Sequence, residues 1–246
     1  MKITLSSRAK KIVRFGDDLR SRGTLCSLAP AILRTNARSL HAPVDRHNRS
    51  AGLVGMTVLT IVVSALAADP FSIKLSHNTP REMQTAQTLK QVLGKYDLSK
   101  YDLSKYTFTR EVAIEERAMN YAFPVLTLNA RFADSPDELL SSFVHEQLHW
   151  YLREHDTQQK AAIAELRQMY PNAPVGLPEG ADTAYSTYGH LVDCYLEIQA
   201  DLELIGPKRT DEVIKSKPWY TWIYKTILRD EDKIRGVVQE HELAIK

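Results

Sequence analysis

The stretch SPDELLSSFVHEQLHWYLREH, residues 135–155, sets the fold of this 246-residue chain. It opens with a capping-box pattern, in which Ser135 can cap a helix, Pro136 suits the first helical position and Glu138 can reach back to the cap. Its apolar residues continue at helical spacing, and no glycine or further proline interrupts them. We therefore predict a helix from Pro136 to about His155.

An H-E-x-x-H motif, made by His145, Glu146 and His149, lies in the middle of this helix. Residues four apart share one helical face, so both imidazoles can reach a single Zn²⁺ at about 2.0–2.1 Å. Glu146 lies beside the pair, where it can serve as general base toward a water molecule. The neighbouring residues are uncharged, as a buried metal helix requires. The motif thus predicts a zinc site with Glu146 as a catalytic residue.

A downstream segment, EIQAD at residues 197–201, resembles the E-x-x-A-D element of gluzincin zinc metallopeptidases. The order of the two motifs along the chain is also the gluzincin order. The resemblance implies that Glu197 is the third zinc ligand. It also implies that Asp201 hydrogen-bonds the non-ligating nitrogen of His145 and so orients that ring. It covers these two motif-bearing segments and points to no more specific family.

His190 is the competing third ligand, because it precedes Glu197 by seven residues and shares its helical face. The two lie about 10 Å apart along the axis, so one metal ion does not take both. We favour Glu197 as the ligand and give His190 the role of lining the cleft and stabilising the oxyanion. Three tyrosines around this helix offer the same donor, although each also suits packing: Tyr185, Tyr188 and Tyr195.

Two other candidate ligands are set aside. His155 stands where the metzincin extension has a histidine, but that pattern needs glycine at position 152, which is leucine here. We expect His155 to be exposed at the end of its helix. Cys194 shares a face with His190 and Glu197, but a free helical cysteine is usually a small buried hydrophobe.

The remaining sequence predicts an α+β domain that is mainly helical, of the zincin-like type implied by the resemblance. Thr79 to Glu82 forms a second capping box, which begins a helix that should end near Gly94. Two short runs rich in β-branched and aromatic residues should pair into a small antiparallel sheet. These expected strands cover residues 106–114 and 125–132, and further helices are expected at 157–170, from about 183 to 206, and from 218 onward.

The first 67 residues are typical of a leader. Basic residues precede an uncharged apolar run at 53–68, which is shorter than the roughly 20 residues of a membrane span. The run ends in Ala65-Leu66-Ala67, an A-x-A pattern that predicts signal-peptide cleavage after Ala67. We expect a single secreted or periplasmic domain at 68–246, with a membrane anchor or a mitochondrial transit peptide as alternatives. Membrane contact would come only through this segment, if it is not removed.

The net charge of +2 gives no reason to expect a nucleic-acid partner. The predicted function is that of a zinc-dependent peptidase acting on a peptide or protein, which could lie extended along the edge strand at 125–132. Two alternatives remain: a zinc hydrolase of a non-peptide amide or ester, and a non-catalytic secreted metal-binding module. Glu146 argues against the second alternative, because a purely structural site needs no general base.

Overall fold

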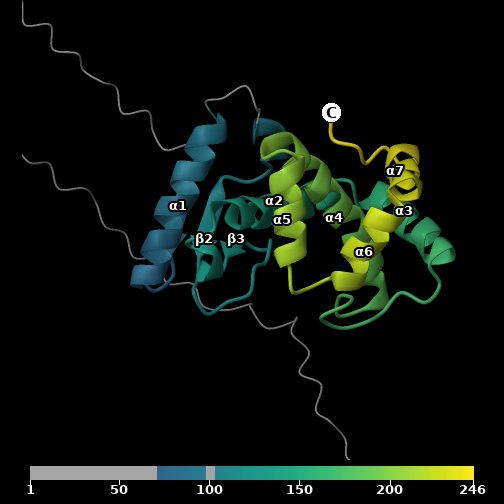
Figure 1. The fold of residues 1–246 in the computed structure, drawn as a ribbon, viewed down its shortest axis with the longest axis horizontal. Coiled ribbons are helices and arrows are strands. Elements are labelled where there is room, and N and C mark those ends of the chain that lie inside the picture. The colour runs from purple at the N-terminus through teal and green to yellow at the C-terminus, as the bar shows by residue number, and fades with distance from the viewer. Residues whose placement is uncertain (1–70, 98–102) are drawn as a thin grey trace, which may run out of the picture. The chain divides into compact units, whose positions relative to one another are not determined.

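The computed structural model describes residues 71–97 and 103–246 (Figure 1). The expected leader, its apolar run and the cleavage site after Ala67 lie outside these residues. No helix within the described residues has the length and apolar character needed to cross a bilayer. The elements are β1 Ser72–Leu75, α1 Pro80–Asp97, β2 Glu111–Ile114, β3 Leu126–Leu128, α2 Pro136–Glu154, α3 Asp156–Met169, α4 Ala184–Leu204, α5 Pro207–Ser216, α6 Thr221–Arg229 and α7 Glu231–Glu240.

The three strands form a parallel sheet in the order β1-β2-β3, so the expectation of an antiparallel sheet was wrong. Residues 115–125 return the chain from the end of β2 to the start of β3, so these two expected strands run in the same direction. The sheet also contains a third strand, β1, which the sequence pattern did not reveal. Helix α1 carries the chain back from the end of β1 to the start of β2, and such a crossover makes neighbouring strands parallel. Apolar residues pair across the register in two rows, Ile73, Val112 and Leu126, then Leu75, Ile114 and Leu128.

Both expected strands are shorter than the sequence suggested. Strand β2 begins only at Glu111, after a 3₁₀ helix at Leu103–Tyr106 and an irregular segment, and a second 3₁₀ helix at Ala130–Phe132 takes the place of the end of the other expected strand. The outer edge of β3 is also partly occupied. Tyr121 forms an isolated antiparallel bridge with Thr127, in which each backbone N–H donates to the other residue's carbonyl at 3.1 and 2.8 Å. Since this bridge uses the backbone groups of Thr127, we no longer expect the substrate to add to this strand.

The capping box at the start of α1 is confirmed. Thr79 Oγ1 accepts a hydrogen bond from the backbone N–H of Glu82 at 3.1 Å, and the Glu82 carboxylate accepts one from the N–H of Thr79 at 3.4 Å. The helix continues past Gly94, the expected end, to Asp97. The matching pattern before α2 behaves differently: the helix begins at Pro136 as expected, but the side chain of Ser135 forms no capping hydrogen bond.

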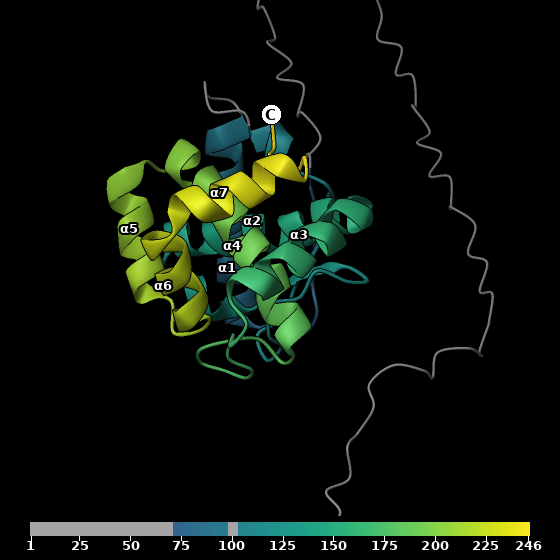
Figure 2. The same ribbon diagram turned by 90° about the vertical axis from the view of Figure 1, so that its right-hand side faces the viewer.

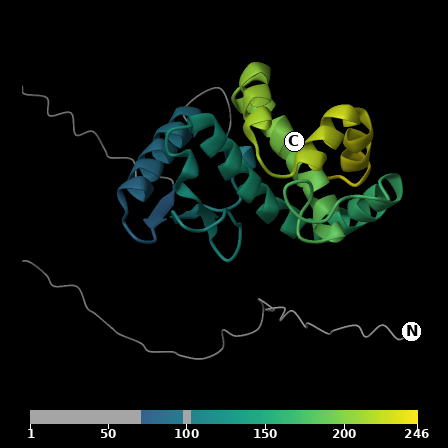
Figure 3. The same cartoon turned by 60° about the horizontal axis from the view of Figure 1, so that its bottom comes forward.

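Helix α2 lies at the centre of the described residues, between the sheet and the C-terminal helices. It packs beside α1 near the sheet (Figure 3) and most extensively against α4. Helices α3, α6 and α7 also contact α4 (Figure 2). The apolar residues that seat α2 in this core are fully buried: Leu139, Leu140, Phe143, Val144 and Leu148. This packing fixes the helix that carries the H-E-x-x-H motif on both sides.

The Glu82 side chain has no exposed surface, and it accepts hydrogen bonds from the backbone N–H groups of His77 and Glu116 besides that of Thr79. Burial alone would raise its pKa, but these donors, first that of His77, lower it from 4.5 to about 2. A carboxylate whose pKa is lowered by folding stabilises the protein above the unfolded pKa. Its contribution is lost as the pH falls from about 4.5 toward 2.

Glu82→Ala should therefore lower the free energy of unfolding by about 1–3 kcal/mol at pH 7. The variant should also lose stability less steeply than wild type between pH 4.5 and 2. Urea unfolding followed by circular dichroism at several pH values measures both effects. Glu138→Ala is the matched control, because Glu138 holds the same position in α2 beside a serine that does not cap; an equal loss in both variants would contradict the role assigned to Glu82.

Candidate metal site

Two stripes of polar side chains face one another where α2 packs against α4. Residues three or four apart share one face of a helix, so each stripe follows from the sequence spacing. The α2 stripe contains Ser141, His145 and His149, and the α4 stripe contains His190, Asp193, Glu197 and Asp201. The three acids of the α4 stripe are buried, so their charges must be compensated within the interface between the helices.

Four of these residues bring one ligand atom each to within 4.8 Å of the others: His145, His149, His190 and Asp193. They form a cluster that can hold a metal ion. Asp193 Oδ2 lies 3.2 Å from Nε2 of His145 and 3.4 Å from Nε2 of His149. Donor atoms around a tetrahedral ion with bonds of about 2.0–2.1 Å are separated by about 3.3–3.4 Å. The observed separations therefore suit ligands of one ion.

The carboxylate of Asp193 is the strongest sign that the cluster is a cation site. Its side chain is fully buried, and neither oxygen has a hydrogen-bond partner. Leaving a buried carboxylate without such partners costs several kcal/mol, by a rough general estimate, unless a cation compensates it. Although its Oδ2 is close to two imidazole nitrogens, it is not hydrogen-bonded to either. That combination is expected where the three atoms point at a common ion.

The other ring nitrogens of two histidines are already engaged. Nδ1 of His145 lies 3.0 Å from Oε2 of Glu197, and Nδ1 of His190 lies 2.8 Å from the carbonyl oxygen of Ser186. Neither oxygen can donate, so each Nδ1 carries a proton and donates it. This tautomer leaves the Nε2 lone pair of both rings available to a metal ion, with the ring orientation fixed from behind.

Glu197 occupies a different place from the one implied by the gluzincin resemblance. Its Oε1 accepts hydrogen bonds from Ser141 and from Lys217, and its Oε2 accepts them from Tyr224 and His145. Both oxygens are thus occupied by hydrogen bonds at 2.7–3.0 Å or shorter. The structure places Glu197 behind His145, in the orienting position that the resemblance gave to Asp201.

Asp201 lies one helical turn beyond Glu197, and its Oδ2 is 2.7 Å from Ser141 Oγ. Ser141 Oγ is also 2.7 Å from Glu197, yet a hydroxyl has only one proton to donate. Burial, followed by the charge of Glu197, raises the pKa of Asp201, so its carboxyl group is protonated at neutral pH. It can then donate to Ser141, which donates in turn to Glu197. Asp201 acts two steps away from His145 rather than directly on it.

A second group, His145, Cys194 and Glu197, also brings possible ligand atoms within 4.8 Å. The hydrogen bonds of Glu197 make this group the weaker candidate, since a metal ion there would have to replace them. Burial raises the pKa of the Cys194 thiol to about 11, so the residue is a neutral thiol at pH 7. It remains a buried, free cysteine, as the sequence suggested.

Two of the four clustered residues have the protonation state that a metal site requires. Burial lowers the pKa of His149 to about 3 and that of His190 to about 4, so both rings are neutral at pH 7, as metal ligation requires. Burial also lowers the pKa of His145, but the carboxylates beside it outweigh this effect and hold the pKa well above its ordinary value, so a metal ion bound at its Nε2 would have to displace a proton. Burial raises the pKa of Asp193 to about 6.

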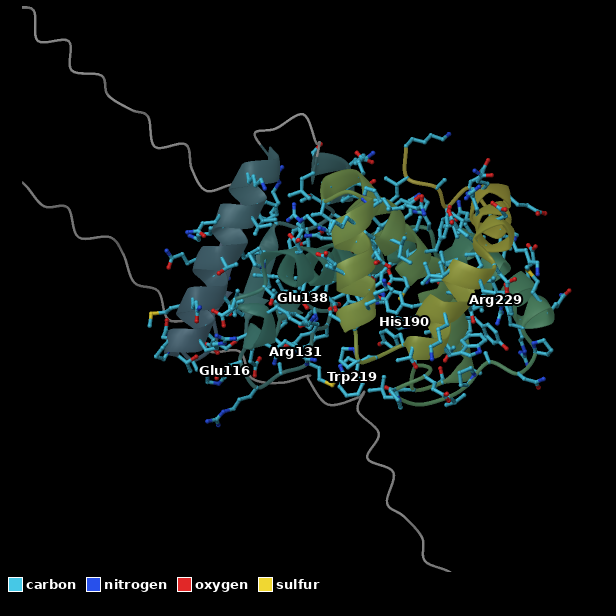
Figure 4. The ribbon with its side chains drawn as sticks, in the orientation of Figure 1. Glu116, Arg131, Glu138, His190, Trp219 and Arg229 are labelled. Carbon is cyan, nitrogen blue, oxygen red and sulfur yellow. The ribbon has the colours of Figure 1, made fainter. Side chains whose placement is uncertain are left out.

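A pocket of about 110 Å³ opens beside the cluster, and both His145 and Glu146 line it. Burial raises the pKa of Glu146 to about 7, so its carboxyl group can exist in both protonation states near neutral pH. Arg131 and Trp219 line the same pocket, and Figure 4 shows both at the lower edge of the molecule, below His190. The pocket thus opens on the side of the cluster where Glu146 lies.

Tyr220 is a pocket residue that the sequence patterns did not single out. Its ring centroid lies 4.4 Å from that of His190 and 6.2 Å from that of His145, and its backbone adopts the left-handed conformation at φ 58°. Burial raises the pKa of its hydroxyl to about 12, so it remains a hydrogen-bond donor at neutral pH. The sequence pattern placed Tyr220 near the start of the helix expected from residue 218 onward, whereas α6 begins one residue later, at Thr221.

The other candidates lie elsewhere. Tyr185 is exposed, the hydroxyl of Tyr188 donates to the Tyr170 carbonyl at 2.7 Å, and Tyr195 is buried in the core. None of these three tyrosines lines the pocket. His155 caps the end of α2, where its Nδ1 lies 2.9 Å from the carbonyl oxygen of Tyr151. It is half-buried rather than exposed and takes no part in the metal cluster.

No protein-family model, curated protein or solved structure matches this chain. The gluzincin resemblance accordingly rests on its two short segments.

Asp193→Asn should weaken Zn²⁺ binding at least about 100-fold, because it removes a ligand charge, whereas Glu197→Gln should weaken it about 10–100-fold through the orientation of His145. Competition with a chromophoric chelator measures both affinities, and circular dichroism shows that each variant is folded. Asp182→Asn, at an exposed acid just before α4, should bind Zn²⁺ like wild type. Unchanged binding in Asp193→Asn would transfer the ligand role to another residue.

Proposed function

We propose that this protein is a zinc-dependent hydrolase that cleaves peptide bonds. The observation that carries the proposal is the buried, unpartnered carboxylate of Asp193 at 3.2 and 3.4 Å from the two motif histidines, beside a pocket lined by Glu146. His145, His149 and Asp193 would hold the ion, with His190 as a fourth donor within reach. Neutral imidazoles and a carboxylate are ligands that zinc prefers.

Bound zinc supplies Lewis-acid chemistry, which makes water nucleophilic at neutral pH and polarises a carbonyl group. Glu146 takes the proton from the attacking water and later delivers it to the leaving amine. Its pKa of about 7 suits both steps, because a group that must accept and then release a proton works best near the ambient pH. Glu197 keeps the Nδ1 proton on His145 throughout, so that its Nε2 stays directed at the site.

Tyr220 is the donor that we assign to the developing oxyanion. Its hydroxyl is protonated at neutral pH, and it lines the same pocket as Glu146. The expected oxyanion role of His190 gives way to that of a metal ligand, because its Nδ1 proton is used by Ser186 and its Nε2 belongs to the cluster. A donor fixed before the reaction stabilises the transition state without reorganisation.

The presence of four protein donors favours one second candidate, a non-catalytic module with a closed metal site. Structural zinc sites usually have four protein ligands, whereas catalytic sites have three and an open position. Glu146 and the pocket favour a catalytic site, because a closed structural site requires neither a general base nor an adjoining pocket. Hydrolysis of a non-peptide amide or ester would use the same residues and differs only in the substrate.

Glu146→Ala should retain Zn²⁺ binding and lose about 10²–10⁴-fold in kcat on a mixed peptide library, because the general base is removed while the ligands remain. Mass spectrometry of the cleaved peptides and metal analysis of the purified variant measure the two properties. Glu154→Ala, at an exposed acid near the end of the same helix, should behave as wild type. Stoichiometric zinc without turnover in the wild type would instead support the closed structural site.

Tyr220→Phe should lower kcat about 10²-fold, while KM and Zn²⁺ affinity stay near their wild-type values. The lost hydroxyl acts on the transition state, so ground-state binding changes little. Steady-state kinetics on the best peptide from the library separates the two parameters. Tyr185→Phe is the matched control at an exposed tyrosine outside the pocket; a comparable fall in kcat there, or none in Tyr220→Phe, would remove Tyr220 from the mechanism.

A further inference from the structure

The pocket beside Glu146 has apolar walls that remain open to solvent. Three of its large apolar side chains are substantially exposed, with Met119 at 57%, Leu177 at 42% and Trp219 at 39%. Exposed apolar groups gathered around one pocket are typical of a binding surface rather than of an ordinary protein surface. Phe132 adds a further ring to the same lining. The pocket thus suits an apolar side chain of the substrate.

Two cations also line this pocket, and they differ in their partners. Lys217 is paired with the buried carboxylate of Glu197. Arg131 has no acidic partner among residues 71–97 and 103–246; its Nε donates to Asn129 Oδ1 at 3.2 Å, and its guanidinium lies 5.8 Å from the centroid of the Phe132 ring. These contacts leave the two terminal nitrogens of Arg131 available as a fork of donors.

The position of Arg131 is held by Asn129, which connects two walls of the pocket. The side-chain amide of Asn129 donates to the carbonyl oxygens of Glu116 and Ala118 at 2.8 and 2.5 Å, and its backbone N–H donates to Asn120 Oδ1 at 2.7 Å. Its Oδ1 accepts from both the backbone N–H and Nε of Arg131. A guanidinium that is oriented in this way loses less side-chain entropy when it binds a ligand.

We propose that Arg131 binds a carboxylate of the substrate, next to an apolar side chain that the pocket walls accept. This inference rests on the proposed function, because it names the substrate class of the same site. A guanidinium fork binds a carboxylate through two parallel hydrogen bonds, and no other charged group of the pocket lining offers that geometry. The carboxylate can be the C-terminus of a peptide or an acidic side chain near the apolar residue.

Calorimetric titration of the full chain with small ligands tests the proposal without any turnover. N-acetylphenylalanine carries the carboxylate beside an apolar ring, and N-acetylphenylalaninamide is its neutral counterpart. The acid should bind about tenfold more tightly than the amide, as expected for a charge-assisted hydrogen-bonded pair. In Arg131→Gln this preference should disappear, and in Arg131→Lys it should be reduced because the fork is lost. Arg167→Gln, an equal loss of charge on the exposed surface of α3, should keep it.

A third ligand, N-acetylaspartylphenylalaninamide, distinguishes the two sources of the carboxylate. Tight binding of this neutral-ended peptide that depends on Arg131 assigns the subsite to an acidic side chain, and weak binding assigns it to a C-terminus. Equal affinity for all three ligands, or a preference for the acid that survives in Arg131→Gln, would overturn the proposal. Failure of the proposed function gives a different result, in which the binding preference is present but no peptide is cleaved.

Discussion

The buried carboxylate of Glu197 is the constraint on which the site depends. A charge in the interior of a protein must be compensated by hydrogen bonds or ion pairs, and this one has four partners. Ser141 and His145 come from α2, Lys217 from the segment after α5, and Tyr224 from α6. One side chain of α4 therefore joins three other parts of the chain. Lys217 and Tyr224 also line the pocket, so the same carboxylate that orients His145 also holds two of the pocket walls.

Short-range signals predicted the helices better than the sheet. The capping box at Thr79 and the helix that begins at Pro136 depend on neighbouring residues, so they could be predicted from the sequence, and both helices begin where expected. The strand direction could not, because it depends on how residues 115–125 connect β2 to β3. Nor could strand β1, a four-residue segment with only partly buried apolar side chains. Its pairing with β2 spans about forty residues, and no local pattern encodes such a contact.

The sequence predicted that the H-E-x-x-H residues of α2 lie in one site. It did not predict the roles of the polar residues on α4. Sequence spacing places His190, Asp193, Glu197 and Asp201 on one face of α4, yet it does not say which of them lies opposite the histidine pair of α2. That depends on how far α4 is shifted along α2. The shift puts Asp193 level with both motif histidines and Glu197 level with Ser141 and His145. A signal for Asp193 existed in its spacing of three residues from His190, but the E-x-x-A-D resemblance gave it no role.

The charges at this interface between α2 and α4 show that a cation would also suit the core of the domain, independently of any catalytic role. Four acids, Glu146, Asp193, Glu197 and Asp201, are buried together, and Lys217 is paired with one of them. Burial raises the pKa of each of the other three, which means that their charged forms are poorly compensated. Asp201 resolves this by staying protonated, and Glu146 borders the pocket. Neither of these applies to Asp193, and both of its carboxylate oxygens lack a hydrogen-bond partner. A divalent ion between the two helices would compensate that carboxylate, so its binding energy would add to the stability of the fold itself.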